Sequence, residues 1–167
     1  MTLGPLRLAA LVAVVFALAP AAARAEEPYV IEKLGEHPRY LFEFEPLVGV
    51  AYDGPFNPNG AAVFGFRVTL NLADGFVQSI NDSVGISAGL EFDPIGNLLL
   101  PVALQWNFWF SDSWSTFVEP GAAISSSATT TVIPVGYLGA RWHLNPRVAL
   151  TLRAGFPDVT LGLSLLL

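Results

Sequence analysis

Residues 40–52 constrain the fold more than any other stretch of the chain, because alternate positions within them differ in chemical character. One set of alternate positions is bulky and apolar, and the other is small or acidic and contains Glu43 and Glu45. Side chains of a β-strand point alternately to its two faces, whereas an α-helix would scatter the two acids among the aromatic residues. The alternation therefore predicts a strand with one apolar and one polar face.

The same alternation recurs in seven further runs, and the breaks between runs are rich in Gly, Pro, Asn, Asp and Ser, which are typical of turns. In the fifth run the alternation is weaker, because Phe117 shares the polar face with Glu119 while Pro120 lies on the apolar face. Most runs have about the 9–11 residues with which a tilted strand crosses a bilayer. The eight predicted strands lie within residues 40–52, 61–72, 84–92, 100–110, 114–124, 137–144, 148–156 and 159–167.

The first residues have the pattern of a secretory signal peptide. A basic start containing Arg7 precedes an apolar run at residues 8–19, and small residues at 23 and 25 fit a cleavage site. The apolar run is shorter than the roughly 20 residues of a membrane-spanning helix, so cleavage is favoured over an uncleaved anchor. We expect residues 1–25 to be a signal peptide and residues 26–39 to be a loosely ordered periplasmic N-terminal tail.

Charge and hydropathy exclude several classes of function. All fourteen acidic residues follow the expected signal peptide, which itself takes two of the eight basic ones. The acidic remainder argues against nucleic acid binding, because no basic stripe is left. Hydrophobic residues make up 53% of the chain, cysteine is absent, and no later run reaches helical spanning length. A closed membrane β-barrel is the common solution for such an exported chain, because pairing between strands satisfies every backbone group.

The size of the side chains on the two faces separates a membrane barrel from a soluble one. The polar face is rich in Gly, Ala and Ser, which suit the crowded interior of an eight-stranded barrel, and no charge lies on the apolar face. We therefore expect an all-β, eight-stranded antiparallel up-and-down transmembrane β-barrel over residues 40–167. A soluble periplasmic lipid-binding barrel is the alternative.

An even number of strands places both termini on one side, which for an exported chain is the periplasmic side of the outer membrane. The outward connections are then residues 53–60, 93–97, 125–130 and 157–158. Aromatic residues collect at the predicted periplasmic strand ends, as in an interfacial girdle. They are Tyr40, Phe42, Phe44, Trp106, Phe108, Phe110, Trp114 and Trp142.

The last run contains a short motif at Thr160, Gly162, Leu165 and Leu167. It resembles the assembly signal of the small eight-stranded outer-membrane β-barrels of Gram-negative bacteria, which include the transmembrane part of outer membrane protein A. Leu167 stands where that group usually has Phe or Trp. The resemblance covers residues 40–167 and implies insertion by the outer-membrane assembly machinery and contact with membrane lipid and lipopolysaccharide. We do not expect the peptidoglycan binding of that group.

One constellation of charged residues is expected inside the barrel. Unpaired charges in so narrow a space cost several kcal/mol each, so arginine side chains should bridge the carboxylates. Glu91 is expected near the outer mouth without an evident partner. The expected network occupies one band in the periplasmic half and consists of Glu43, Glu45, Arg67, Glu119, Arg141 and Arg153.

The network suggests two functions. In the first it fills the lumen and fixes the strand register of a structural, envelope-integrity protein. In the alternative, exchange of ion-pair partners gates a narrow, low-conductance channel for water or small ions. No pattern predicts an oligomeric state.

Catalysis, a cofactor and a metal are not expected. His37 lies in the tail and His143 at the periplasmic interface, and no nucleophile–base spacing accompanies them. Asp53, Asp93 and Asp158 in the outer connections leave weak cation or lipopolysaccharide bridging as an alternative to ordinary turn chemistry.

Overall fold

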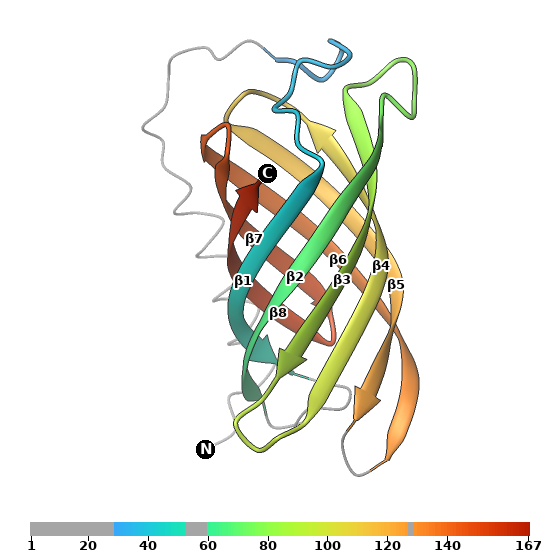
Figure 1. Ribbon diagram of the computed structural model, residues 1–167, viewed down its shortest axis with the longest axis vertical. Coiled ribbons are helices and arrows are strands. Elements are labelled where there is room, and N and C mark those ends of the chain that lie inside the picture. Colours follow the sequence, from blue (N-terminus) through green and yellow to red (C-terminus); the bar gives the residue numbers. More distant parts are fainter. Residues whose placement is uncertain (1–28, 53–59, 127–128) are drawn as a thin grey trace.

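Each alternating run forms one strand of a closed β-barrel (Figure 1). The computed structural model describes residues 29–52, 60–126 and 129–167. Each strand pairs antiparallel with the next, and β8 pairs with β1 to close the barrel, which confirms the predicted architecture. No helix in this part of the chain is long and apolar enough to cross a membrane. The strands are β1 (Phe42–Ala51), β2 (Ala61–Asp74), β3 (Asp82–Phe92), β4 (Leu98–Trp109), β5 (Trp114–Ser126), β6 (Thr130–Asn145), β7 (Val148–Phe156) and β8 (Asp158–Leu166).

Burial alternates along the strands, with the polar face inside. Glu45, Arg67 and Glu119 are each at most 1% exposed, whereas outward residues such as Val48 and Leu138 are exposed. The faces assigned to the fifth run are confirmed, because Phe117 and Glu119 are buried while Pro120 is exposed. The small and charged side chains therefore fill the interior, and the bulky apolar ones cover the outside.

The loop predicted at residues 125–130 is shorter than expected. Ser125 pairs with Thr131 and Ser126 with Thr130, so the strands extend into the polar sequence. Hydrogen bonds between neighbouring strands pair the backbone N–H and C=O groups whatever the polarity of the side chains. A polar composition therefore does not end these strands.

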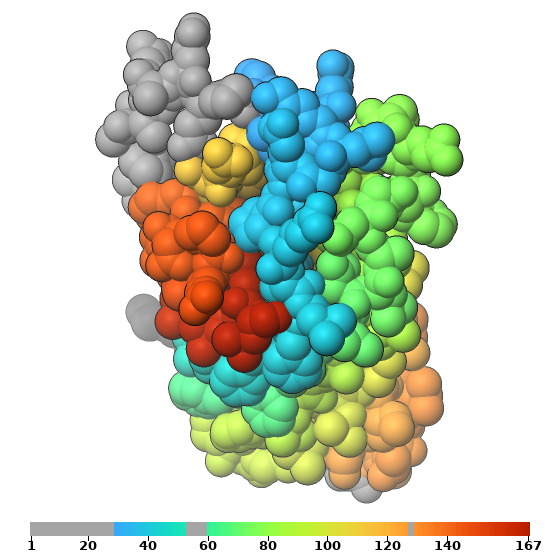
Figure 2. Space-filling view, turned by 45° about the horizontal axis from the view of Figure 1, so that its top comes forward, coloured from blue at the N-terminus to red at the C-terminus, as the bar shows by residue number. Residues whose placement is uncertain are grey.

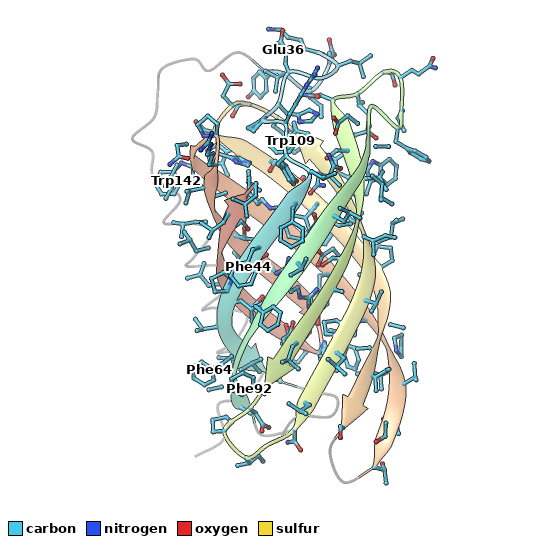
Figure 3. The ribbon with its side chains drawn as sticks, in the orientation of Figure 1. Glu36, Phe44, Phe64, Phe92, Trp109 and Trp142 are labelled. Atoms are coloured by element: carbon cyan, nitrogen blue, oxygen red, sulfur yellow. The ribbon has the colours of Figure 1, made fainter. Side chains whose placement is uncertain are left out.

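The barrel has two distinct ends (Figure 1). The terminal end carries residues 29–41, Leu167 and the β2–β3, β4–β5 and β6–β7 turns, and the loop end carries the other four connections. Trp114 and Trp142 stack at the terminal end with centroids 6.2 Å apart. Phe64 and Phe92 pair at the same distance toward the loop end (Figure 3). Outward aromatic residues therefore lie toward both ends and not at one end only.

Tyr40 does not belong to the outer face, and this part of the predicted girdle is wrong. The amides of Leu41 and Phe42 both donate to the Leu167 carbonyl, each over 3.0 Å. Two consecutive residues thus oppose one residue of the last strand, as in a β-bulge. Leu41 and Phe42 both face outward, and Tyr40 turns inward, where it is 8% exposed.

The N-terminal segment, residues 29–40, packs across the terminal mouth and is not the loose tail that its composition predicts (Figure 2). The Val30 amide donates to the Phe110 carbonyl over 2.9 Å, and the Asn81 amide donates to the Ile31 carbonyl over 2.6 Å. The Asn81 side chain also donates to the Glu36 carbonyl over 3.0 Å. The β2–β3 and β4–β5 connections therefore anchor this segment.

Candidate functional site

The barrel interior contains an unbroken chain of ion pairs. Arg153 binds Glu45 through two hydrogen bonds of 2.8 and 3.0 Å, and its Nε donates to Glu119 Oε2 over 2.8 Å. Arg67 also donates to Glu119 Oε2, over 3.1 Å, and its Nη2 lies 2.7 Å from Glu91 Oε1. We call this series, Glu45–Arg153–Glu119–Arg67–Glu91, the charge ladder.

Arg141 forms a separate pair with Glu43. Its Nη2 lies 3.0 and 2.8 Å from the two carboxylate oxygens, and its Nη1 donates to Asn107 Oδ1 over 2.6 Å. The structure thus places all six residues of the predicted network in ion pairs, divided between the ladder and this pair.

Glu91 is not unpaired, and the expectation that it lacks a partner is wrong. Arg67 faces Gly89 in the β2–β3 register, so Glu91 is its diagonal neighbour on the same face. Diagonal neighbours lie within reach of long side chains. Glycine leaves room for the arginine, because a Cβ at Gly89 would lie 2.8 Å from Arg67 Cγ. The ladder therefore extends toward the loop end and is not confined to one band.

Asp158 was expected in an outer loop, yet it begins β8 with its side chain fully buried. It accepts a hydrogen bond of 3.1 Å from the Tyr137 hydroxyl, and the Arg67 guanidinium lies 4.5 Å above the centre of the Tyr137 ring. Asp158 and Tyr137 thus belong to the interior, beside the part of the ladder nearest the loop end.

The other acids of the outer connections provide no shared cation site in the described structure. Asp93 accepts from the amides of Ile95 and Asn97, both over 3.0 Å, which is ordinary turn chemistry. Asp53 lies outside the described residues. Within residues 29–52, 60–126 and 129–167, no three His, Asp or Glu side chains are grouped so that they could hold a metal ion.

Phe117 provides an aromatic surface beneath two of the arginines. The Arg141 and Arg153 guanidiniums lie 4.3 and 5.1 Å from the centre of its ring, as in cation–π contacts. Gly139 is its direct partner on β6, and a Cβ there would overlap the ring. Phe117 was expected on the inner face, but its contact with the two arginines was not expected. The signal for it in the sequence is a large residue opposite a glycine on the neighbouring strand.

Two polar residues of the interior were also missed. The Gln105 amide donates to Glu119 Oε1 over 2.6 Å, and Asn107 accepts from Arg141. Both lie on the inner face of β4, and their position on that face is the only sequence signal for this role.

A stack of three rings closes the terminal end. His37 lies parallel to Trp109 with centroids 4.8 Å apart, and His143 lies on Trp109 at 5.0 Å. His143 is buried and shares a 2.9 Å hydrogen bond with the Ser115 hydroxyl, so its expected interfacial position is wrong. Tyr40 packs edge-on against Trp109, and burial raises the pKa of its hydroxyl. We call the buried group of Val30, Tyr40, Trp109 and Leu166, with the two histidines, the terminal cap.

An apolar layer lies at the loop end of the interior. It lies between the ladder and the loop-end termini of β1, β2, β4 and β5. We call this layer the loop-end cluster, and it consists of Ala51, Val63, Leu99, Ala123, Val135 and Tyr137.

The four residues of the predicted assembly signal lie on or directly after β8. Thr160 and Gly162 face inward, whereas Leu165 and Leu167 face outward. Gly162 has a structural role, because a Cβ there would collide with the Glu45 carboxylate. Recognition by the assembly machinery stays a prediction.

No protein-family model and no curated protein sequence matches the chain. Among solved structures it is similar to a de novo designed transmembrane β-barrel, with a TM-score of 0.58 and 16% identity over 75% of this chain and 94% of that one. The chain has the fold of a transmembrane β-barrel.

Two further solved structures are also similar. The de novo designed protein TMB2.3, solved by solution NMR, has a TM-score of 0.58 and 14% identity over 80% of this chain and 98% of its own. The N-terminal β-barrel domain of OprF from Pseudomonas aeruginosa has a TM-score of 0.48 and 14% identity over 74% of this chain and 95% of its own. At such identities the likeness concerns the fold alone.

Proposed function

We propose that this chain is an integral outer-membrane β-barrel that acts as a structural, envelope-integrity protein with a closed lumen and both termini in the periplasm. The charge ladder is the observation that carries this proposal. Its arginines and glutamates are buried, and Arg67 and Arg153 each bridge two glutamates across the interior. Breaking such a buried pair leaves an uncompensated charge, so the ladder resists opening.

Apolar groups on either side of the ladder support a closed lumen. Trp109 of the terminal cap and Leu99 of the loop-end cluster are both fully buried. An ion that moved along the barrel axis would have to displace apolar side chains at each end and charged pairs between them. Desolvation makes such a path costly.

The distribution of polarity supports the membrane location over a soluble lipid-binding barrel. A lipid carrier needs an apolar cavity and a polar exterior. Here Arg67, Arg141 and Arg153 are inside, while outward residues such as Leu72, Val102 and Leu138 are more than half exposed. A hydrocarbon solvent accounts for this arrangement, because large exposed apolar surfaces are costly in water.

Planar-bilayer recording on the purified, refolded protein tests the closed lumen. We expect the wild-type protein to leave the bilayer electrically silent. Stepwise conductance of the wild-type protein would overturn closure and support the alternative, a narrow channel for water or small ions. The Arg67→Ala variant tests whether the charged network gates the lumen or only fills it, because loss of Arg67 removes one ion-pair partner from Glu91 and one from Glu119. A silent bilayer with both the wild-type protein and this variant would contradict a gate. Arg147→Ala, in an exposed turn, is the matched control.

Fractionation tests the location. We expect the protein in the outer-membrane fraction, with a gel mobility that changes on boiling as the barrel unfolds. A protein recovered from the soluble periplasm without such a shift contradicts the proposal.

A further inference from the structure

The outer surface of the terminal end contains a groove of about 550 Å³ between residues 39–41 and the end of β2. Both of its sides are irregular. The bulge at Leu41 and Phe42 lies on one side, and the β2–β3 register shifts between Asn71 and Ala73 on the other. Bulges bend a strand and interrupt its backbone hydrogen bonding, and the groove lies between these two irregular segments, which remain joined by the hydrogen bond from the Asn71 amide to the Leu41 carbonyl.

One part of the groove is apolar and faces outward. Leu41 and Leu167 are each 66% exposed and Leu72 is 55% exposed, and all three line the groove. Leucines in this position offer a contact surface for hydrocarbon chains. The groove therefore continues the lipid-facing surface of the barrel.

The rest of the groove carries two separated opposite charges. Arg39 is exposed and forms no ion pair with any residue that the structure describes. Asp74 accepts from the Asn71 side chain over 2.8 Å and lies 3.8 Å from His37 Nε2, yet 41% of its side chain remains exposed. Both residues line the groove, so a cation and an anion are held apart beside a leucine surface.

Outward aromatic residues surround the end of the barrel at which the groove lies, although they are not confined to this end. The stacked Trp114–Trp142 pair is at this end, and Trp106 lies between Phe76 and Phe108 with centroid distances of 6.1 and 4.9 Å. Amphipathic aromatic rings sit at the level of lipid headgroups. A headgroup at this depth meets Arg39 and Asp74, and its acyl chains meet the leucines.

We propose that this groove binds a zwitterionic phospholipid of the phosphoethanolamine class from the adjoining leaflet. The Arg39 guanidinium presents a donor fork to the phosphate, and the Asp74 carboxylate accepts from the ammonium. A glycerol headgroup would meet Arg39 through the same phosphate, but it offers Asp74 neutral hydroxyl groups in place of the ammonium. The groove therefore selects ethanolamine over glycerol headgroups. This inference rests on the proposed membrane location of the barrel.

Native mass spectrometry after gentle extraction from vesicles tests the proposal. The vesicles contain equimolar phosphatidylethanolamine and phosphatidylglycerol. We expect the wild-type protein to retain phosphatidylethanolamine about threefold over phosphatidylglycerol, the size of effect that one partly exposed charge pair provides. Arg39→Gln should lower retention of both lipids, and Asp74→Asn should remove the preference.

Two surface residues at the same end provide matched controls. Arg147→Gln and Asp112→Asn remove the same charges from exposed turns that do not line the groove. Equal retention by Arg39→Gln and Arg147→Gln, or a wild-type preference for phosphatidylglycerol, would overturn the proposal. Insertion is scored separately by the gel shift on boiling. A protein that inserts without the preference contradicts only the lipid site, whereas one that does not insert contradicts the proposed function.

Discussion

Arg153 on β7 reaches past β8 and binds Glu45 on β1 through two hydrogen bonds of 2.8 and 3.0 Å. The pair links residues that are 108 positions apart in the chain. Gly162 on the intervening strand faces Leu47 and Thr151 on its two neighbours, and its missing Cβ leaves the space that the Glu45 carboxylate occupies. The ion pair therefore spans the seam at which the first and last strands close the barrel.

Arg153→Met should destabilise the barrel strongly. The substitution leaves Glu45 without its guanidinium partner and removes one of the two arginines on Glu119. Loss of one partner from a buried pair costs about 3–5 kcal/mol of unfolding free energy. Urea unfolding in detergent micelles, followed by tryptophan fluorescence, measures the loss. Arg147→Met controls for removal of an exposed arginine, and a loss of under about 1 kcal/mol for Arg153→Met argues against a structural role for the ladder.

Gly162→Ala should destabilise the barrel by about 1–3 kcal/mol, because overpacking forces the Glu45 carboxylate out of its position. Gly136→Ala is the matched control within a strand, since a Cβ at Gly136 meets nothing within 4 Å. Refolding in vitro separates this effect from recognition of the assembly signal. A double-mutant cycle with Glu45→Ala should show coupling between the two positions. Equal stability of the two glycine variants would contradict the close fit.

Trp109 should be shielded from water by the terminal cap. In a variant with Trp106, Trp114 and Trp142 replaced by Phe, we expect acrylamide to quench the remaining tryptophan poorly. His37→Ala removes the ring stacked on Trp109 and should increase quenching. Lys33→Ala changes an exposed position in the same segment and should not increase quenching. Efficient quenching of Trp109 in the variant with three Trp→Phe substitutions, before His37 is changed, would show that the N-terminal segment does not cover the mouth.

Single cysteines should report the orientation of the barrel, because the chain contains no native cysteine. Ile95 in the β3–β4 connection and Asp112 in the β4–β5 turn are exposed at opposite ends. We expect a membrane-impermeant maleimide to label Ile95→Cys on intact cells and Asp112→Cys only after the outer membrane is permeabilised. The reverse pattern contradicts periplasmic termini.

Local alternation predicted the strands and their two faces, and the small size of the residues on the polar face indicated that this face is inside. Glu43 and Glu45 occupy alternate positions of one run, and a strand is the conformation that keeps them on one face. The same reasoning placed Phe117 and Glu119 inside, although the alternation in that run is weaker. These inferences needed only the period and the size of the side chains, which are properties of consecutive residues.

The partners inside the barrel were decided by the tertiary structure. Glu91 binds Arg67 because the β2–β3 register makes them diagonal neighbours, and Asp158 turns inward because β8 begins at that residue. The bulge at Leu41 and Phe42 depends on a hydrogen-bond partner at the other end of the chain.

The sequence by itself therefore determined the strands, their faces and the need to pair the buried charges. Only the closed barrel decided which charges meet, which way Tyr40 points and that residues 29–40 cover the terminal mouth. The physical reason is that side-chain alternation is local. Register and closure depend on contacts between segments far apart in the chain, and a shift of one residue would exchange the two faces.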